Sequence, residues 1–222
     1  MCFLFSGLNK AKEPKIEVEI KPMDMEAFKE RAKVIADEAA DKAAKELSIF
    51  NVMEKVKEAR ERVKKYKENQ LKWDRRFLGL AQYYSSFSKD PSTKVGAVLV
   101  NEDRIVVGMG YNGFPRGVED TEERLNNREL KYKIVCHAEV NAIINAGHRA
   151  KDCTLYVWPA FVSPPICNEC CKVAIQAGIT RIVGYKGDEE SEVAKRWKES
   201  ILISRDMCKE AGIEVVELEE IK

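Results

Sequence analysis

Hydrophobic and polar positions follow one pattern in the first 70 residues and another pattern after them. The segment KIEVEIK, residues 15–21, alternates apolar and charged side chains and predicts a half-buried strand. Asp24 can cap the helix that follows, and a second, strongly charged helix is expected over about residues 52–70. The apolar stripe of the first helix consists of Phe28, Ala32, Ile35, Ala39, Ala43 and Leu47. Residues 1–70 are therefore expected to form a mostly helical extension, and no motif in them indicates its role.

From Trp73 onward, short apolar runs alternate with amphipathic ones. A helix over about residues 73–88 leads into two apolar strands joined by a short turn, and a polar stretch, residues 114–133, follows them. The expected strands span residues 95–101, 104–112, 153–158, 180–185 and 213–218, and the later helices begin near residues 138, 167 and 191. This alternation predicts an α/β domain, residues 71–222, with parallel strand pairs and helices on both faces of the sheet.

The charge of the chain argues against a polynucleotide partner. After Lys72 the chain holds 21 basic and 23 acidic residues, whereas a nucleic-acid-binding face usually shows a strong basic excess. The basic segment KVKEARERVKKYK, residues 55–67, could contact nucleic acid, but its interleaved glutamates favour a solvated helix face.

No segment of the chain resembles a membrane span or a signal peptide. No apolar run reaches the roughly 18 residues that a membrane-spanning helix needs. The opening MCFLFSGLNK is apolar, but no basic stretch precedes it and no small-residue cleavage pattern follows it. We therefore expect a soluble, cytoplasmic protein in which this opening forms a strand or a packing segment.

The segment GMGYNG matches the glycine pattern of dinucleotide-binding sites at Gly108, Gly110 and Gly113. Pro115 follows at once, so no helix opens whose N-terminus could bind a pyrophosphate. The glycines are therefore interpreted as turn residues.

Two clusters hold residues that suit metal or redox chemistry. His137, one of only two histidines, stands two residues before Glu139 where a loop leads into a helix. Among seven cysteines, Cys167 and Cys170 are three apart in the first turn of another predicted helix, where backbone N–H groups favour thiolates. Taken alone, this cysteine pair fits a redox dithiol, half of a metal site or two buried structural cysteines.

Together the two clusters form the H-x-E and C-x-x-C signature of zinc deaminases. One imidazole and two thiolates supply three tetrahedral ligands and leave the fourth position for water, whose pKa the metal lowers towards about 7. Glu139 then has to stay unligated, because the reaction needs a base that moves protons.

Four segments, SKDPSTKVGAVLV, GYNGFPRG, CHAEVNAI and CNECCKVAIQAGI, occur in this order. With them, residues 73–217 resemble deoxycytidylate (dCMP) deaminases of the cytidine deaminase superfamily. The resemblance implies a cytidine-deaminase-like three-layer α/β/α fold with a five-stranded mixed sheet. It also implies hydrolysis of dCMP to dUMP and ammonia, with one catalytic zinc ion per chain.

The resemblance assigns His137, Cys167 and Cys170 as zinc ligands and Glu139 as the proton shuttle. Cys171 stands where the family often has a small residue, and the alignment of the segment favours Cys170 as the ligand. Because the polar stretch 114–133 holds no Cys or His, the second, structural zinc of some relatives is not expected.

Contacts with the substrate are also implied by the resemblance. Asn112 is expected to contact the nucleoside, and the backbone N–H of Ala138 to hold the pyrimidine carbonyl group. Tyr156 is expected near the base, with packing in the core as an equal alternative. The side chains expected at the 5′-phosphate, for which an ordinary solvated loop is the alternative, are Ser88, Lys89 and Lys94.

One departure from the family concerns the residues before the first cysteine ligand. Pro165 and Ile166 precede Cys167, whereas relatives commonly have proline directly before it, so the shape of the leaving-group pocket is expected to differ. The resemblance further suggests dCTP and dTTP as effectors, Mg²⁺ bound with such a nucleotide, and a homo-oligomer, often a hexamer. A deaminase of cytidine, guanine or a tRNA adenosine stays an alternative, as do a thiol redox protein and a non-catalytic zinc protein.

Overall fold

The computed structural model describes residues 24–46, 49–159, 164–188 and 190–219. The chain divides into two compact units, one ending at Arg62 and the other beginning at Val63. The strand predicted for residues 15–21 and the opening segment lie outside the described residues. Among the described residues, no helix has an apolar stretch long enough to cross a membrane.

Within the described part of the chain, two helices precede the sheet. The first, α1 (Met25–Glu46), begins after Asp24, whose carboxylate accepts hydrogen bonds from the backbone N–H groups of Glu26 and Ala27 at 3.1 and 3.2 Å, as predicted for a cap. The second, α2 (Ile49–Ser85), is a single helix of 37 residues. The predicted break between residues 70 and 73 is therefore wrong, because the sequence there, QLKW, contains no helix breaker.

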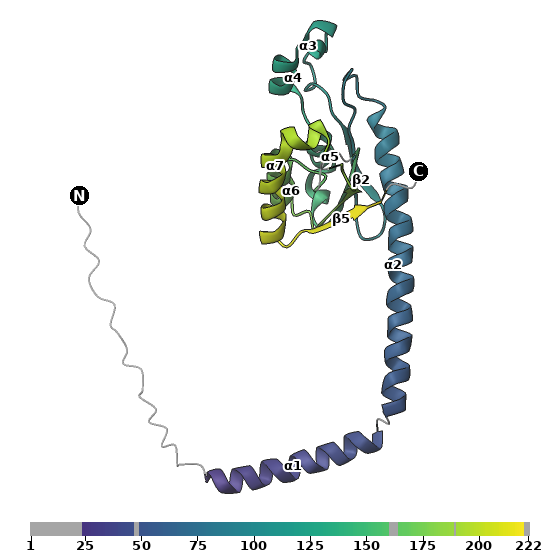
Figure 1. Cartoon of the computed structure of the whole chain (residues 1–222), viewed down its shortest axis with the longest axis vertical. Helices are drawn as coiled ribbons and strands as arrows, with labels where there is room; N and C mark the ends of the chain where they lie inside the picture. Colours follow the sequence, from purple (N-terminus) through teal and green to yellow (C-terminus); the bar gives the residue numbers. More distant parts are fainter. Residues whose placement is uncertain (1–23, 47–48, 160–163, 189, 220–222) are drawn as a thin grey trace, which may run out of the picture. The chain divides into compact units, whose positions relative to one another are not determined.

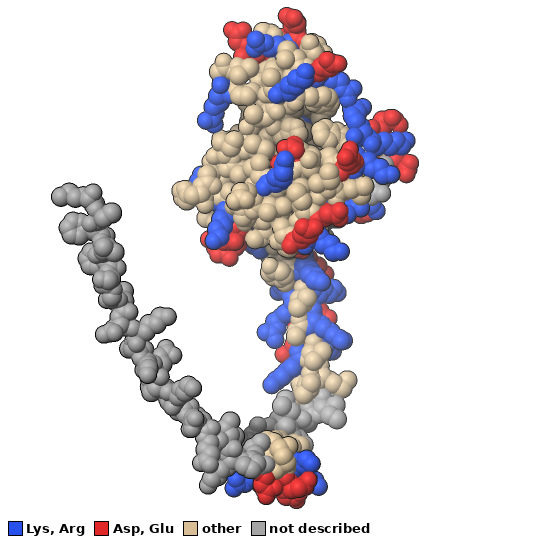
Figure 2. Space-filling view, turned by 90° about the vertical axis from the view of Figure 1, so that its left-hand side faces the viewer, with Lys and Arg blue, Asp and Glu red and all other residues tan. Residues whose placement is uncertain are grey.

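The exposed part of α2 is strongly basic. Residues 51–69 are exposed, and Lys and Arg side chains cover much of this stretch (Figure 2). Between Ile49 and Asn69 the helix contains seven Lys and Arg residues but only four glutamates. Because these glutamates are interleaved with the basic residues, this part of α2 is a solvated helix surface of mixed charge.

A five-stranded mixed sheet forms the centre of the second unit. Its strands are β1 (Gly96–Val100), β2 (Val106–Tyr111), β3 (Thr154–Trp158), β4 (Arg181–Tyr185) and β5 (Glu214–Leu218), in the spatial order β2-β1-β3-β4-β5. β1 is antiparallel to both β2 and β3, whereas the pairs β3–β4 and β4–β5 are parallel. The sheet confirms the fold class expected from the sequence.

Helices cover both faces of this sheet (Figure 1). Phe77, Leu78 and Ala81, near the end of α2, pack on one face against Val98 and Tyr156. The opposite face is covered by α5 (Ala138–Ala146), α6 (Asn168–Gln176) and α7 (Glu192–Glu210). Successive strand residues point to opposite faces, so the fully buried β1 contributes to both cores. These layers confirm the predicted three-layer α/β/α arrangement.

Two glycines of β2 allow α5 to lie close against the strand. A Cβ atom on Gly110 would lie 2.2 Å from the carbonyl oxygen of Ala138, and one on Gly108 would lie 2.4 Å from that of Ala142. The interpretation of these two as turn residues is therefore wrong, since both lie inside a strand. Their missing side chains bring the start of α5 against the sheet.

The polar stretch 114–133 contains two short helices, α3 (Glu122–Asn126) and α4 (Arg128–Ile134). Thr121 and Asn127 cap their N-termini through side-chain oxygens. A 3₁₀ turn, η1 (Gly147–Ala150), follows α5. Just before α5, Gly113 and Cys136 exchange backbone hydrogen bonds of 3.1 and 2.8 Å, which fixes the loop that leads into this helix.

Candidate zinc and active site

Three potential metal ligands converge at the start of two helices. The Nδ1 atom of His137 lies 3.2 Å from the Sγ atom of Cys170 and 3.3 Å from that of Cys167. All three ligand atoms lie within 4.8 Å of one another, and the described part of the chain contains one such cluster. Zinc bond lengths of about 2.3 Å to sulfur and 2.0–2.1 Å to nitrogen place tetrahedral N and S ligands about 3.5 Å apart. The residues therefore fit a zinc ion.

The backbone explains why these side chains are available. His137 precedes α5 in an extended conformation and makes no capping hydrogen bond, so its imidazole is free to face the two sulfurs. Cys167 caps α6, where its Sγ atom accepts a hydrogen bond from the backbone N–H of Cys170 at 3.5 Å. A helix N-terminus favours the thiolate form of cysteine.

Proton positions in this cluster follow from its hydrogen bonds. Hydrogen bonds from the Cys170 thiol and from His137 lower the pKa of Cys167 to about 4, although burial opposes this. The hydrogen bond with Cys167 raises the pKa of His137 to about 9, again against burial. At neutral pH the cluster thus holds a Cys167 thiolate beside a protonated imidazole, which releases its proton when a metal binds.

The neighbouring Cys171 faces away from this cluster. Its Sγ atom lies 3.5 Å from that of Cys208 in α7, and both side chains are buried in the core. Consecutive helical residues point about 100° apart, so Cys170 and Cys171 cannot face the same point. This geometry agrees with the expectation that Cys170, and not Cys171, is the ligand.

Glu139 and Ala138 form the first turn of α5 beside the cluster. Glu139 is only 6% exposed, and burial raises the pKa of its carboxyl group. The backbone N–H groups of a first helical turn have no acceptor within the helix, so the N–H of Ala138 can donate to a bound molecule. Both residues line the same cavity as His137 and Cys167.

This cavity is open to solvent, and the space inside it, with its open mouth included, is about 970 Å³. Asn112 lies in its wall, as the predicted nucleoside contact requires. The Asn112 side chain accepts a hydrogen bond from the backbone of Val95 and donates one to the backbone of Thr93, each of 2.8 Å. Pro165 and Ile166 also line the cavity, next to Cys167.

Tyr156 lies on the other side of the sheet. It is 1% exposed, its ring packs 5.2 Å from that of Phe77, and its hydroxyl donates a 2.9 Å hydrogen bond to Asp74. The predicted position beside the base is therefore wrong, and core packing is what the structure shows. The next residue, Val157, lines the cavity instead, because adjacent strand residues point to opposite faces.

The structure does not bring the three side chains expected at the phosphate to the cavity wall. The Ser88 hydroxyl is buried and donates to the carbonyl oxygen of Asn112 at 2.8 Å. Lys89 is exposed and pairs with Asp120 at 2.8 Å. Lys94 is exposed on the same loop.

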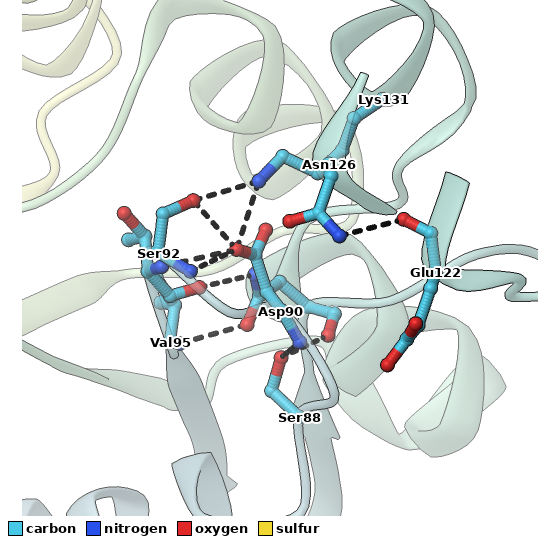
Figure 3. Close-up of polar contacts among 9 residues, drawn as sticks. Ser88, Asp90, Ser92, Val95, Glu122, Asn126 and Lys131 are labelled. Carbon is cyan, nitrogen blue, oxygen red and sulfur yellow. Dashed lines mark hydrogen bonds and ion pairs between the residues drawn. The ribbon is translucent and has the colours of Figure 1, made fainter. Parts of the chain in front are cut away.

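Other polar and aromatic residues occupy the wall and were not anticipated. The Nζ atom of Lys131 in α4 lies 2.9 Å from Asp90 and 2.7 Å from the Ser92 hydroxyl (Figure 3). From α7, Arg196 and Trp197 line the cavity, and the Trp197 ring lies 6.4 Å from that of His137. No sequence motif marks these residues, since they reach the site only through the packing of distant helices.

The site combines a cluster of one imidazole and two cysteine sulfurs with a buried carboxylate that lines the adjoining cavity. On a three-layer α/β/α fold, this is the arrangement of a zinc-dependent hydrolytic deaminase. The sequence profile of the cytidine and deoxycytidylate deaminase zinc-binding region matches residues 71–186, and the chain belongs to this family. The family and the ligand cluster agree on a zinc site.

Several known proteins are similar to this chain. An uncharacterized deaminase from the luxG 3′ region of Aliivibrio fischeri is 40% identical over 146 residues, which cover 65% of this chain and 92% of that protein. Deoxycytidylate deaminase of Mus musculus is 40% identical over 143 residues, which cover 59% of this chain and 76% of that protein. The crystal structure of dCMP deaminase from the cyanophage S-TIM5 in apo form superposes with a TM-score of 0.47 at 22% identity, over 65% of this chain and 96% of that chain.

Proposed function

We propose that the protein hydrolyses free dCMP to dUMP and ammonia. The observation that carries this proposal is the buried Glu139 beside the His137, Cys167 and Cys170 cluster, in the wall of a cavity that is open to solvent. The similarity to proteins named deoxycytidylate deaminase supports dCMP as the substrate. The alternatives, a thiol redox protein and a non-catalytic zinc protein, leave the buried carboxylate without a purpose.

Zinc, when bound by these three side chains, activates water for attack on an electrophilic carbon. Glu139 takes up a proton from that water, delivers it to N3 of the cytosine ring and passes the second proton to the departing amine. A buried carboxyl group with a raised pKa suits this double role, because it holds a proton more readily than a solvated one. The products, dUMP and ammonia, account for all atoms of dCMP and water.

Two contacts would orient the base for this reaction. We propose that the backbone N–H of Ala138 holds the pyrimidine carbonyl oxygen, since it opens α5 directly between the ligand His137 and Glu139. We propose that Asn112, which also lines the cavity, contacts the nucleoside. One amide proton of Asn112 is used by Thr93, so the other can donate to the substrate.

The remaining proposals rest on the resemblance to the family. They are a homo-oligomer, a hexamer by this resemblance, effector binding by dCTP and dTTP with Mg²⁺, and a place in the cytoplasm. We also propose that residues 1–70 are not needed for the chemistry, because the candidate ligands and Glu139 all lie between residues 137 and 170.

A substrate panel tests the proposed function directly. The zinc-loaded full chain is incubated with dCMP, deoxycytidine, cytidine, guanine, tRNA and single-stranded DNA, and ammonia release is measured. We expect dCMP to give the highest kcat/KM. A higher kcat/KM on a nucleoside, or activity on a polynucleotide alone, would place the protein in another branch of the family.

A further inference from the structure

The cavity wall carries two basic side chains besides the ligand His137. They are Lys131 from α4 and Arg196 from α7. A nucleotide differs from its nucleoside by a phosphate that is mostly a dianion at neutral pH, so a site that selects the nucleotide needs positive charge that is not already neutralised. The surroundings of the two cations decide which one meets this need.

The charge of Lys131 is neutralised within the protein. Its ammonium group and the Asp90 carboxylate lie 2.9 Å apart, and the two side chains are 7% and 8% exposed. The Ser92 hydroxyl takes a second hydrogen bond from the same ammonium group (Figure 3). Two of its three protons are thus used, and its counter-ion is fixed beside it. Lys131 therefore holds the cavity wall in place and adds no net charge to it.

The charge of Arg196 is not neutralised in this way. Arg196 is exposed at the cavity, and its side chain makes no ion pair or hydrogen bond with any other residue that the structure describes. Among the described residues its guanidinium group therefore has no fixed counter-ion, and it supplies the cavity wall with a positive charge. A planar guanidinium group can donate two parallel hydrogen bonds to phosphate oxygens.

The packing of α7 places Arg196 firmly relative to the zinc site. Val193, Arg196 and Trp197 all line the cavity, and their i, i+3, i+4 spacing puts them on one face of the helix. One turn further on, the Ser200 hydroxyl accepts a 3.0 Å hydrogen bond from the backbone N–H of Asn168 and donates one of 2.8 Å to its side chain. Asn168 directly follows the ligand Cys167, so α7 is tied to the helix that carries two of the three ligands.

We infer that Arg196 binds the 5′-phosphate of the substrate and thereby determines the preference for nucleotide over nucleoside. This inference rests on the proposed function and assigns its phosphate contact to α7, not to the loop that holds Ser88, Lys89 and Lys94. Lys131, Asp90 and Ser92 line the same cavity, where the Lys131 ammonium group and the Asp90 carboxylate neutralise each other.

The test compares Arg196→Gln with Lys195→Gln. Lys195 is the neighbouring basic residue of α7, pairs with Glu192 at 3.2 Å and is not in the cavity wall, so its substitution removes the same charge from the same helix. For the zinc-loaded full chain, Kd values for dUMP and deoxyuridine are measured by calorimetry. The kcat/KM values for dCMP and deoxycytidine are measured by ammonia release.

Arg196→Gln is expected to weaken dUMP binding by about 10- to 100-fold, the range for a charge-assisted contact, and to leave deoxyuridine binding unchanged. The kcat/KM ratio of dCMP to deoxycytidine should fall by a similar factor through KM, and Lys195→Gln should keep the wild-type values. An unchanged ratio in Arg196→Gln, or an equal loss in Lys195→Gln, would overturn the inference. A further outcome separates the two proposals. If the wild type binds dUMP through Arg196 but does not turn over dCMP, the phosphate site is supported and the proposed function is contradicted.

Discussion

The ammonium group of Lys131 lies 2.9 Å from the Asp90 carboxylate, and neither side chain is more than 8% exposed. Asp90 precedes β1, whereas Lys131 belongs to α4, 41 residues later. The same carboxylate oxygen accepts hydrogen bonds from the backbone N–H groups of Ser92 and Thr93. The pair therefore joins the polar stretch 114–133 to the wall of the active-site cavity.

Replacing Asp90 should destabilise the protein more than replacing Lys131. Asp90→Ala leaves a buried ammonium group without its counter-ion, which typically costs about 3–5 kcal/mol. Lys131→Met leaves the Asp90 carboxylate with two backbone N–H donors, so we expect a smaller loss in the free energy of unfolding. Free energies of unfolding from urea titrations of the zinc-loaded chain provide the comparison, and a larger loss in Lys131→Met would contradict it.

The contribution of Asp90 should also depend on pH. Burial raises its pKa, but hydrogen bonds from Lys131 and then from Ser92 and Thr93 bring the pKa below its ordinary value of 3.8. Its stabilisation is therefore fully present above that value and disappears as the pH falls below it. As the pH is lowered from about 4, the wild type should lose stability more steeply than Asp90→Asn. Parallel curves would refute the prediction.

Zinc content should follow the three predicted ligands. His137→Ala, Cys167→Ser and Cys170→Ser should each lose the metal, because two remaining ligands hold zinc poorly. Cys171→Ala is the matched control, since its thiol faces Cys208. Elemental analysis after gel filtration should find about one zinc per chain in the wild type and the control. Loss of zinc from the Cys171 variant with retention in the Cys170 variant would reverse the assignment.

Glu139→Gln should fold and keep its zinc but turn over dCMP more slowly by about 10²- to 10⁴-fold, the usual contribution of a general acid–base group. Glu169→Gln serves as the control, because Glu169 is exposed on α6 and pairs with Lys172 at 2.7 Å. The measurement is kcat together with zinc content for both variants. A Glu139 variant with near-normal kcat would exclude the proton-shuttle role.

Adding one methyl group at Gly110 should displace the start of α5 and thereby disturb the zinc site. The new Cβ atom of Gly110→Ala would lie 2.2 Å from the Ala138 carbonyl oxygen, so the start of α5 has to move. We expect a loss of at least about 1–3 kcal/mol in the free energy of unfolding, with weaker zinc binding. Gly79→Ala is the control: it meets nothing within 4 Å and should stabilise α2 by up to about 1 kcal/mol. A Gly110 variant with wild-type stability and zinc affinity would disprove the close packing.

A chain that begins at Val63 should retain zinc and dCMP turnover. This start keeps all of the second compact unit, including Asp74, which binds Arg181 through two hydrogen bonds of 2.8 and 2.9 Å. Its kcat/KM and zinc content are compared with those of the full chain. Normal zinc content without turnover would show that the first unit takes part in the chemistry.

The elements and the ligand cluster followed from the sequence because they leave local signals. The apolar runs of the strands, the cap at Asp24 and the spacing within each of the two motifs, His137 with Glu139 and Cys167 with Cys170, are each readable within one short segment. Tyr156 was misplaced because an aromatic residue in a buried strand fits either face until the register is known. The contacts of Lys131 and Arg196 depend on how α4 and α7 pack, and no local pattern encodes that packing.

The loop between α2 and β1 is held in place by its own hydrogen bonds. Asn112 bonds the backbone of Thr93 and Val95, and the Ser88 hydroxyl bonds the Asn112 carbonyl oxygen. A ligand that enters from this side meets a wall whose backbone is already held by these hydrogen bonds. Ligand binding therefore costs little further conformational entropy of this loop. The contacts between the ligand and this wall then contribute to the affinity almost in full.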